Sequence, residues 1–513
     1  MMLNRLKLFP VAILVALGAC AVNPVTGKSE LVGMSEEQEI KVGEENYGPM
    51  QQAEGGEFDI DPVLTEYVQS IGDKLAAVSD RSLPYEFVVL NNSVPNAWAL
   101  PGGKIALNRG LLTELQSEAE LAAVIGHEIV HAAAGHTSQR QGRTTVLQSI
   151  LLGTVIATSG SKYGDVAAGG ANIGAQLITQ RYGQGDELES DKYGMKYMSL
   201  AGYDPQGAVE LQKTFVRLSE GRESDWLSGL FASHPPSQKR VDANIETAAG
   251  LPSGGELGVE PFKAAMKKTM KAKPAYDIND EGRKLLSDGE AEKAIAKANE
   301  AIAMFPEEAH FYALRGDARL LNEEYNMAVT NYDSAIDRRD SFFYYYLQRG
   351  RSKEELNNYA EAKTDLEKSN SLLQTSVAYF SLGRIAAAEG DTETAIGHFE
   401  KIAGAKGDVA VAAQTELAKL DLSRNPHKYV LKRCDASSNG DLVVSVKNNT
   451  TLPIDNIGFV VEYTDANGRQ KSEARKVAAQ LDGGEVTSVD THLGPYTDGS
   501  NCPVRITSAR IAE

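Results

Sequence analysis

The segment 126–131, Gly-His-Glu-Ile-Val-His, places two imidazoles four residues apart with a carboxylate beside the first. At about 3.6 residues per helical turn, His127 and His131 would lie one turn apart on one face, where both can bind one metal ion. Glu128 would lie on the adjacent flank, where it can take a proton from water at the metal. This pattern predicts a zinc hydrolase. The alternative is a chance histidine pair on a solvated helix face.

The residues before the motif favour a helix independently of the motif itself. Ser117 followed by Glu120 forms a capping-box pattern, which is typical of a helix start. An apolar run follows at Leu121, Val124, Ile125 and Ile129. We therefore expect both histidines to lie near the middle of this helix.

A catalytic zinc site usually has three protein ligands and an open position, so a third ligand must come from elsewhere in the chain. Glu187 and Asp191 lie one turn apart in a second predicted helix, which should end near Gly202 with Pro205 following. Glu187 is the candidate third ligand, and Asp191 could hold a ligating histidine in place. The alternative is an ordinary acidic helix start, which the helix dipole favours.

Four motifs in this order closely resemble those of the family M48 metallopeptidases. Besides the two motifs above, residues 96–107 resemble the family's strand ahead of the zinc helix. Residues 234–240, His-Pro-Pro-Ser-Gln-Lys-Arg, are similar to its late His-Pro-x-x-x-x-Arg element. The resemblance covers roughly residues 30 to 250. It implies a zincin-like fold, one zinc ion per chain, and Glu187 rather than Glu189 as the metal ligand.

The late motif contributes two further candidate residues. In the related periplasmic β-barrel assembly-enhancing proteases, the histidine matching His234 can occupy the fourth zinc position and silence the enzyme, which implies an inhibitory fourth ligand here. By the same resemblance, Arg240 should face the cleft and stabilise the oxyanion of the tetrahedral intermediate. The alternatives are a loop histidine and a surface arginine. The remaining histidines are assigned no metal: His136, His310, His398, His427 and His492.

A turn and a strand are predicted ahead of the zinc helix. Pro101, Gly102 and Gly103 form a turn signal, and residues 104–107 alternate like an edge strand. An edge strand beside a zinc cleft could bind substrate in extended form through main-chain hydrogen bonds. The alternative is an ordinary hairpin.

A segment rich in glycine and alanine, 146–180, connects the two predicted metal-binding helices. Its glycines would leave the backbone mobile, so one hypothesis is a flexible cover over the active site. A buried helical hairpin is the alternative.

The N-terminus is typical of a bacterial lipoprotein. A basic start precedes an apolar run from Leu8 to Ala19, and Cys20 follows. Residues 1–19 would be the signal peptide and Cys20 the lipidated first residue of the mature chain. An uncleaved anchor is the alternative, but the run is short for a bilayer. Because Ala21 rather than Asp follows the cysteine, we expect an outer-membrane lipid anchor facing the periplasm of a Gram-negative bacterium.

Composition and cysteine usage fit a secreted protein. The chain has 513 residues, enough for about three domains. With 52 basic and 70 acidic residues the net charge is −18, and no strongly basic cluster is visible, which argues against nucleic acid as a partner. Beyond Cys20, only Cys434 and Cys502 remain. They could close a disulfide in an oxidising compartment, or stay as two unpaired buried thiols.

A repeat follows the predicted protease domain. Gly282, Gly316, Gly350 and Gly383 recur at 34, 34 and 33 residues, and an alanine follows each glycine twelve residues later. The period is similar to that of tetratricopeptide repeats, in which small residues let paired helices pack closely and stack. The concave surface of such a solenoid typically binds a peptide or partner protein. The periodic aromatic residues are expected in the core: Tyr332, Phe380 and Phe399.

We therefore expect a mainly α, multidomain protein. A Gly-rich stretch followed by lysines favours a linker after the protease, and alternating segments split by turns favour a small antiparallel sandwich at the end. The predicted parts are a signal peptide at 1–19, an α+β zincin-like metalloprotease domain at 20–255, a linker at 256–274, tetratricopeptide-like repeats at 275–424 and a β-sandwich at 425–513.

The expected activity is a zinc endopeptidase anchored at the outer membrane, acting in quality control or assembly of envelope proteins. Its expected partners are protein substrates in extended form and, through the repeats, outer-membrane assembly machinery. One alternative is a chaperone or assembly factor whose zinc site is largely latched. Another is a zinc-stabilised structural module without turnover.

Overall fold

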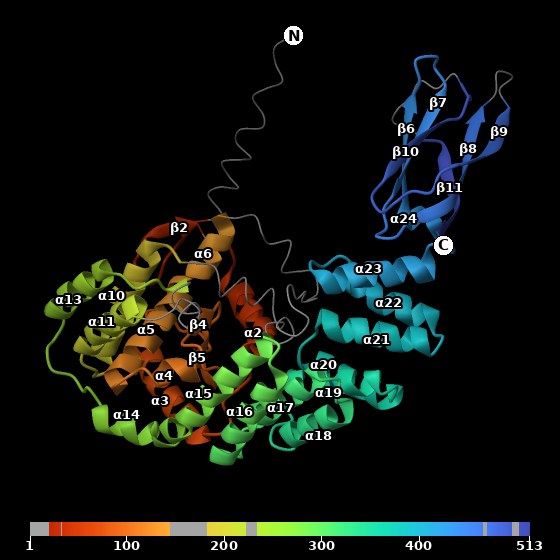
Figure 1. Ribbon diagram of the computed structural model, residues 1–513. Coiled ribbons are helices and arrows are strands. Elements are labelled where there is room, and N and C mark those ends of the chain that lie inside the picture. The colour runs from red at the N-terminus through yellow and green to blue at the C-terminus, as the bar shows by residue number, and fades with distance from the viewer. Residues whose placement is uncertain are drawn as a thin grey trace, which may run out of the picture. The chain divides into compact units, whose positions relative to one another are not determined.

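The computed structural model describes residues 20–31, 33–143, 182–221, 233–464, 469–494 and 502–512 (Figure 1). The predicted signal peptide and the Gly/Ala-rich segment lie outside the described residues. Contacts divide the chain into two compact units, with the boundary in the repeat region between Leu373 and Gln374. The first unit holds the protease fold and the first repeats, and the second holds the last repeats and the C-terminal strands.

The protease part of the first unit is a small sheet surrounded by helices. Its N-terminal elements are β1 (Cys20–Val22), β2 (Ser29–Leu31), α2 (Glu36–Ala53), α3 (Pro62–Ala76), β3 (Glu86–Leu90), β4 (Ala97–Leu100), β5 (Lys104–Asn108) and α4 (Arg109–Leu112). The helices that follow are α5 (Glu118–Ala134), α6 (His136–Arg143), α10 (Gln184–Leu200), α11 (Gln206–Gly221) and α13 (Gln238–Gly250). This arrangement confirms the expected α+β protease domain.

Strands β3, β4 and β5, which precede α5, form a mixed sheet in the order β3-β5-β4. β4 and β5 are an antiparallel hairpin, and β3 pairs with β5 in parallel. The turn needs its glycines because Gly102 and Gly103 have φ values of 80° and 86°. The prediction of an edge strand at 104–107 is wrong, because β3, from a segment before the hairpin, covers its other side. The edge strand on the hairpin is β4.

Helix α5 begins at the predicted capping residue, but His131 lies in its last turn and not near its middle as expected. The Ser117 side chain accepts a hydrogen bond from Glu120 N at 3.2 Å. In a capping box the Glu120 side chain would accept from the backbone N–H of Ser117. Here its Oε2 accepts from Gln116 N, one residue earlier, at 2.8 Å. Gly135, with φ 70°, ends the helix in the left-handed region, where glycine is favoured. Both motif histidines therefore lie in a regular, fully buried helix.

The predicted linker at 256–274 is instead helical and packed. It forms α14 (Val259–Ala265) and the first part of α15 (Lys267–Ser287). Phe262, Met266 and Ala272 join the same hydrophobic core as α3 and α5. The lysines that suggested a linker lie on the outer face of these helices, while the apolar residues recur at helical spacing on the inner face.

The repeat helices of the first unit pair along the chain after α15. They are α16 (Ala291–Met304), α17 (Ala309–Leu321), α18 (Tyr325–Ile336), α19 (Phe343–Glu355) and α20 (Tyr359–Leu372). A β-carbon on Gly316 would lie 2.7 Å from the Tyr332 ring, so this glycine makes room for a fully buried aromatic side chain. The same reason for a glycine recurs in the next repeat, where a β-carbon on Gly350 would meet Leu366 at 2.9 Å.

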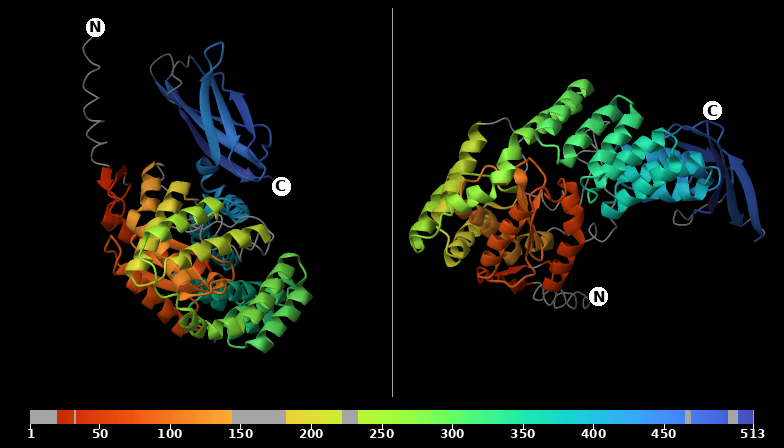
Figure 2. Two further views of the ribbon diagram at one scale, coloured as in Figure 1. Left: turned by 90° about the vertical axis from the view of Figure 1, so that its left-hand side faces the viewer. Right: turned by 90° about the horizontal axis from the view of Figure 1, so that it is seen from below.

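The second unit begins with the remaining repeat helices, α21 (Ser376–Ala388), α22 (Thr392–Ala403), α23 (Asp408–Asp421) and the short α24 (Pro426–Tyr429). Here Gly383 makes room for Phe399, which is fully buried as expected, whereas Phe380 is only half-buried. The helix pairs can be followed in green and cyan in Figure 2.

In the described part of the second unit, six strands form two antiparallel three-stranded sheets around one apolar core. They are β6 (Val430–Ala436), β7 (Leu442–Asn448), β8 (Ile454–Thr464), β9 (Gln470–Lys476), β10 (Val486–Asp490) and β11 (Val504–Ile511). The sheet orders are β10-β7-β6 and β11-β8-β9. Cys434 on β6 and Cys502 just before β11 form a disulfide that joins the two sheets. The β-sandwich prediction is confirmed.

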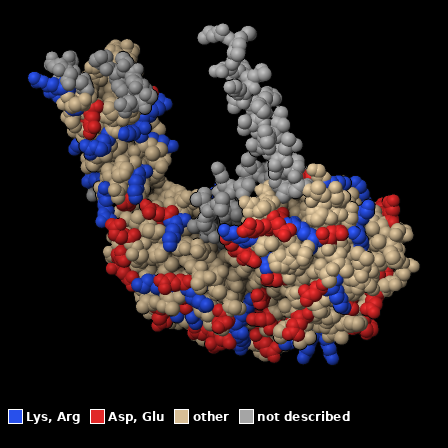
Figure 3. Space-filling view, turned by 180° about the vertical axis from the view of Figure 1, so that it is seen from behind, with Lys and Arg blue, Asp and Glu red and all other residues tan. Residues whose placement is uncertain are grey.

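No helix within the described ranges has the length and apolar character to cross a bilayer. Acidic and basic side chains are interspersed over the face drawn in Figure 3. The acidic excess of the sequence is therefore distributed among basic residues on this face.

Candidate metal centre

Two glycines bring the motif-bearing helices together. Gly126 on α5 and Gly194 on α10 face each other so closely that a β-carbon on Gly194 would lie 2.9 Å from His127 N. A β-carbon on Gly126 would lie 3.0 Å from Gly194 O. Because neither residue has a side chain, the backbones pack directly, and residues one or two turns along each helix can meet across the crossing.

Two imidazoles and a carboxylate converge beside this crossing. The Nε2 atoms of His127 and His131 are 3.0 Å apart. Glu187 on α10 places Oε1 3.5 Å from His131 Nε2 and Oε2 3.6 Å from His127 Nε2. All three side chains are buried, and Glu187 is 1% exposed. The sequence-predicted ligand set is thus brought to one point by two helices far apart in the chain.

His234 completes this cluster as a fourth member. Its Nδ1 lies 3.0 Å from Glu187 Oε1 and 3.2 Å from His127 Nε2. The four potential ligand atoms of His127, His131, Glu187 and His234 all lie within 4.8 Å of one another. A buried group of three imidazoles and one carboxylate fits the ligand preference of Zn²⁺. His234 therefore lies beside the three predicted ligands, within reach of the same point.

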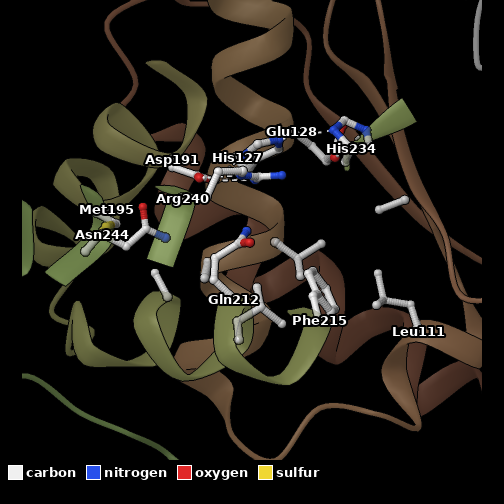
Figure 4. A pocket seen from close by; sticks show the side chains of 15 residues that line it. Leu111, His127, Glu128, Asp191, Met195, Gln212, Phe215, His234, Arg240 and Asn244 are labelled. Carbon is white, nitrogen blue, oxygen red and sulfur yellow. Dashed lines mark hydrogen bonds and ion pairs between the residues drawn. The ribbon is translucent and has the colours of Figure 1, made fainter. Parts of the chain in front are cut away.

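Glu128 lies beside the cluster without belonging to it. Its Oε1 is 3.6 Å from His234 Nε2, and its Oε2 has no hydrogen-bond partner among the described residues. Burial raises the pKa of this carboxyl group even though His234 and His127 oppose the shift. Figure 4 shows the residue at the end of a cavity that extends toward Leu111 and Phe215. A carboxylate with a raised pKa and an unengaged oxygen is suited to exchange protons.

Asp191 and Arg240 contact the proposed ligands His127 and Glu187 through hydrogen bonds and an ion pair. Asp191 Oδ1 accepts from His127 Nδ1 at 2.9 Å, and both Asp191 oxygens accept from Arg240 at 2.7 Å (Figure 4). Arg240 Nη1 also lies 2.8 Å from Glu187 Oε2. The guanidinium expected to meet an oxyanion is therefore engaged with two carboxylates. We assign Arg240 a positioning role in place of the oxyanion role.

His131 is held on its far side by residues that the sequence reasoning passed over. His136 Nδ1 lies 2.9 Å from His131 Nδ1, and His136 Nε2 lies 3.3 Å from Glu189 Oε1. The Tyr182 ring stacks on His131, with centroids 3.9 Å apart. The sequence signal for His136 is Gly135, which redirects the chain, so that a residue five positions after His131 packs back against it.

The charges of the cluster favour an anionic Glu187 next to neutral imidazole. Burial alone would raise the pKa of Glu187, but His234 and His127 hold it well below its ordinary value. Burial lowers the pKa of His131 well below its ordinary value. Burial would also raise the pKa of Asp191, yet the Arg240 guanidinium lowers it. Burial would lower the pKa of His234, but Glu187 and Glu128 raise it above its ordinary value. An anionic Glu187 and a neutral His131 are the states in which these two groups bind a metal ion.

This geometry agrees with a comparison against protein families. Residues 62–248, which contain α5, α10 and the start of the late motif's helix α13, match the model of peptidase family M48. This segment is a peptidase family M48 domain. Residues 279–342 and 347–410 match the tetratricopeptide repeat. The resemblance to M48 peptidases with repeats is therefore confirmed.

Curated relatives include proteases from bacteria and mitochondria. A β-barrel assembly-enhancing protease of Yersinia pestis is 31% identical over 189 residues, which are 36% of this chain and 38% of the relative. The mitochondrial metalloendopeptidase OMA1 of Schizosaccharomyces pombe is 34% identical over 34% of this chain and 51% of its own length. Metalloprotease LoiP of Escherichia coli is 28% identical over 36% of this chain and 71% of its own length. The chain thus spans about two fifths of the assembly-enhancing protease.

Proposed function

We propose that this protein is a zinc-dependent endopeptidase of the bacterial periplasm that acts in quality control or assembly of envelope proteins. The single observation that carries the proposal is the convergence of His127, His131 and Glu187 beside Glu128, in a domain of peptidase family M48. His127, His131 and Glu187 would hold one zinc ion per chain. The ion would supply Lewis-acid polarisation of the substrate carbonyl and lower the pKa of water toward 7.

The residues of the chain would then move the proton and keep the ligands in place. Glu128 takes a proton from the attacking water and delivers it to the leaving nitrogen. Its Oε2 has no hydrogen-bond partner among the described residues, and its raised pKa makes the carboxylate a stronger base. Asp191 holds His127 through Nδ1, and Arg240 holds both Asp191 and Glu187. Protein substrates would bind in extended form along the edge strand β4, which pairs only with β5 among the described strands.

The location rests on sequence features and on the named relatives. Cys20 is the proposed lipid-attachment residue, with removal of residues 1–19, and Ala21 favours the outer membrane. The disulfide between Cys434 and Cys502 supports an oxidising compartment such as the periplasm. Outer-membrane assembly machinery is the proposed partner of the repeats. Mass spectrometry of the mature N-terminus tests the anchor, and an unmodified Cys20 in protein from the native host would contradict it.

Replacing Glu128 with glutamine tests the activity. The variant keeps the size of the side chain but removes the base, so cleavage of an unfolded test protein should fall by on the order of 10²- to 10⁴-fold. Zinc content should stay at one ion per chain, measured by elemental analysis. Undiminished cleavage by Glu128→Gln would overturn the mechanism. A wild-type protein that binds no zinc would overturn the metal assignment.

A second candidate function is a chaperone or assembly factor whose protease site is largely latched. The position of His234 favours it, since its two ring nitrogens contact the proposed ligands on one side and Glu128 on the other. In this state His234 would fill the position that water and substrate need. His234→Ala should then raise peptidase activity while zinc stays bound. Equal activity of His234→Ala and the parent would remove the latch.

A further inference from the structure

Helix α10 places three acidic residues around the two motif histidines. Glu187 lies at the cluster itself, and Asp191, one turn later, accepts a hydrogen bond from His127 Nδ1 at 2.9 Å. Glu189 lies between them in sequence and points to the opposite flank, toward His136 at 3.3 Å. The two histidines therefore have different partners at Nδ1. Nδ1 of His127 contacts the Asp191 carboxylate directly. Nδ1 of His131 contacts the His136 imidazole, which in turn contacts Glu189.

The imidazole behind His131 is held there by the backbone. In an uninterrupted helix, residues five positions apart lie about 140° apart around the axis and do not meet. Gly135 ends α5 with φ 70°, and α6 begins at His136. The His136 ring therefore turns back onto His131, with ring centroids 4.9 Å apart and Nδ1 atoms 2.9 Å apart. His136 is 4% exposed, so water has little access to this hydrogen bond.

Only one arrangement of protons suits a metal at His131 Nε2. When Nε2 binds a metal, the neutral ring carries its proton on Nδ1, and this proton is donated to His136 Nδ1. His136 must then accept at Nδ1 and carry its own proton on Nε2. That proton faces Glu189 Oε1, which accepts it. Each group thus fixes the tautomer of the next.

We propose that His136 and Glu189 form a relay that fixes the tautomer and orientation of His131 for metal binding. His136 is a positioning residue and not a metal ligand, since both of its ring nitrogens are occupied away from the cluster. This inference rests on the proposed zinc site. It goes further by assigning roles to His136, which follows the His-Glu-x-x-His motif, and to Glu189, which occupies a variable position of the Glu-x-x-x-Asp motif.

Paired substitutions in the full-length protein distinguish hydrogen bonding from packing. His136→Leu fills the space but cannot accept a proton, whereas the side-chain oxygen of His136→Asn can accept from His131 Nδ1. Glu189→Leu removes the acceptor for His136, whereas Glu189→Gln keeps one. Asp186→Asn is the matched control, because it neutralises an acid in the same helix whose carboxylate accepts from Gly183 N at the helix start.

The readout is zinc affinity by competition with a chromogenic chelator, with the melting temperature of the metal-free protein measured alongside. His136→Leu and Glu189→Leu should weaken zinc binding by roughly 10- to 100-fold, the usual effect of losing such a partner. His136→Asn, Glu189→Gln and Asp186→Asn should stay near the parent value. If His136→Leu does not fold, Glu189→Leu carries the test, since its side chain is 17% exposed.

The outcomes separate this inference from the proposed function. A parent protein that binds zinc, together with leucine variants that bind it equally well, would overturn the relay and leave the zinc site intact. A lower melting temperature in the leucine variants with unchanged zinc affinity would also overturn it, because it would indicate a packing role. A parent protein that binds no zinc would instead overturn the proposed function.

Discussion

Gly126 and Gly194 touch backbone to backbone, and this contact sets how far apart the two motif-bearing helices lie. A β-carbon on Gly194 would lie 2.9 Å from His127 N and 3.0 Å from Gly126 C, both backbone atoms that cannot move aside alone. The contact therefore couples the spacing of α5 and α10 to the position of the first motif histidine.

Gly194→Ala should push α5 and α10 apart. We expect a loss of unfolding free energy of about 1–3 kcal/mol from overpacking, together with weaker zinc binding. Gly185→Ala on the same helix is the control, because a β-carbon there meets nothing within 4 Å. Urea unfolding and chelator competition measure the two effects. Equal zinc affinity in Gly194→Ala and Gly185→Ala would show that the crossing does not set the site.

Arg240→Lys should impair the metal centre although the charge is kept. A lysine cannot reproduce the paired hydrogen bonds to Asp191 while also reaching Glu187. We expect zinc affinity to fall by roughly 10-fold or more. Lys239→Met, which removes the neighbouring exposed cation, should leave it unchanged. If Arg240 acted only on the oxyanion, Arg240→Lys would lower turnover and leave zinc affinity at the parent value.

Zinc removal should destabilise the protease domain. Without an ion, Glu187 and three imidazoles remain packed together in a buried site, whereas a bound ligand stabilises the folded state. At a zinc concentration near 100 times Kd, the gain in unfolding free energy is about 2.7 kcal/mol. Calorimetry before and after dialysis against a chelator measures the shift. Recovery with Mg²⁺ as complete as with Zn²⁺ would contradict the assigned donor preference.

Acid should weaken the contact between the protease fold and the first repeats through His310. Burial lowers the pKa of this imidazole from 6.5 to about 4. It donates to Gly55 O at 3.1 Å and accepts from the Tyr345 hydroxyl at 2.7 Å, so the neutral ring is fully satisfied. The unfolded chain binds the proton first as pH falls. Stability is therefore full above about pH 6.5 and falls toward pH 4, by about 2 kcal/mol between pH 7 and pH 5.

Urea unfolding at several pH values measures this loss. His310→Gln should flatten the dependence in that window, because glutamine does not titrate. His427→Gln, at an exposed position, should keep the parent slope. The interpretation fails if the two variants lose the same free energy between pH 7 and pH 5.

The disulfide between Cys434 and Cys502 should matter for the sandwich and not for the metal centre. Its cysteines are 68 residues apart, and a loop of that length corresponds to about 4 kcal/mol of entropy removed from the unfolded chain. Replacing both cysteines with alanine should lower the melting temperature of the C-terminal unit. Zinc affinity should be unchanged. A simultaneous loss of zinc binding would show that the units are coupled.

Local patterns were sufficient to predict much of the site. The spacing of His127, Glu128 and His131 and the cap at Ser117 are both short-range signals, and they define α5 correctly. Glu187 followed from the four-residue spacing to Asp191 together with the family resemblance. These features need no knowledge of how distant segments pair.

The errors arose where distant segments decide the structure. The strand at 104–107 becomes central only because β3 pairs with it, and no feature of the hairpin itself indicates that. Arg240 does line the cavity beside His127 and Glu128, as the resemblance implies. Its guanidinium is nevertheless engaged with Asp191 and Glu187, and these contacts depend on where α10 lies. The linker prediction followed the lysines and overlooked the helical spacing of Phe262 and Met266, which the sequence does contain.

The continuity of the apolar core has a practical consequence for dissecting the molecule. That core extends from α3 through Phe262 and Tyr276 to Phe311 on α17, past the end of the family match at residue 248. Cutting the chain at residue 255 would remove aromatic side chains from the interior of the peptidase domain and expose the apolar surface that they cover. We therefore expect the smallest fragment that folds on its own to include the first repeat, because this repeat contributes side chains to the peptidase core as well as starting the solenoid.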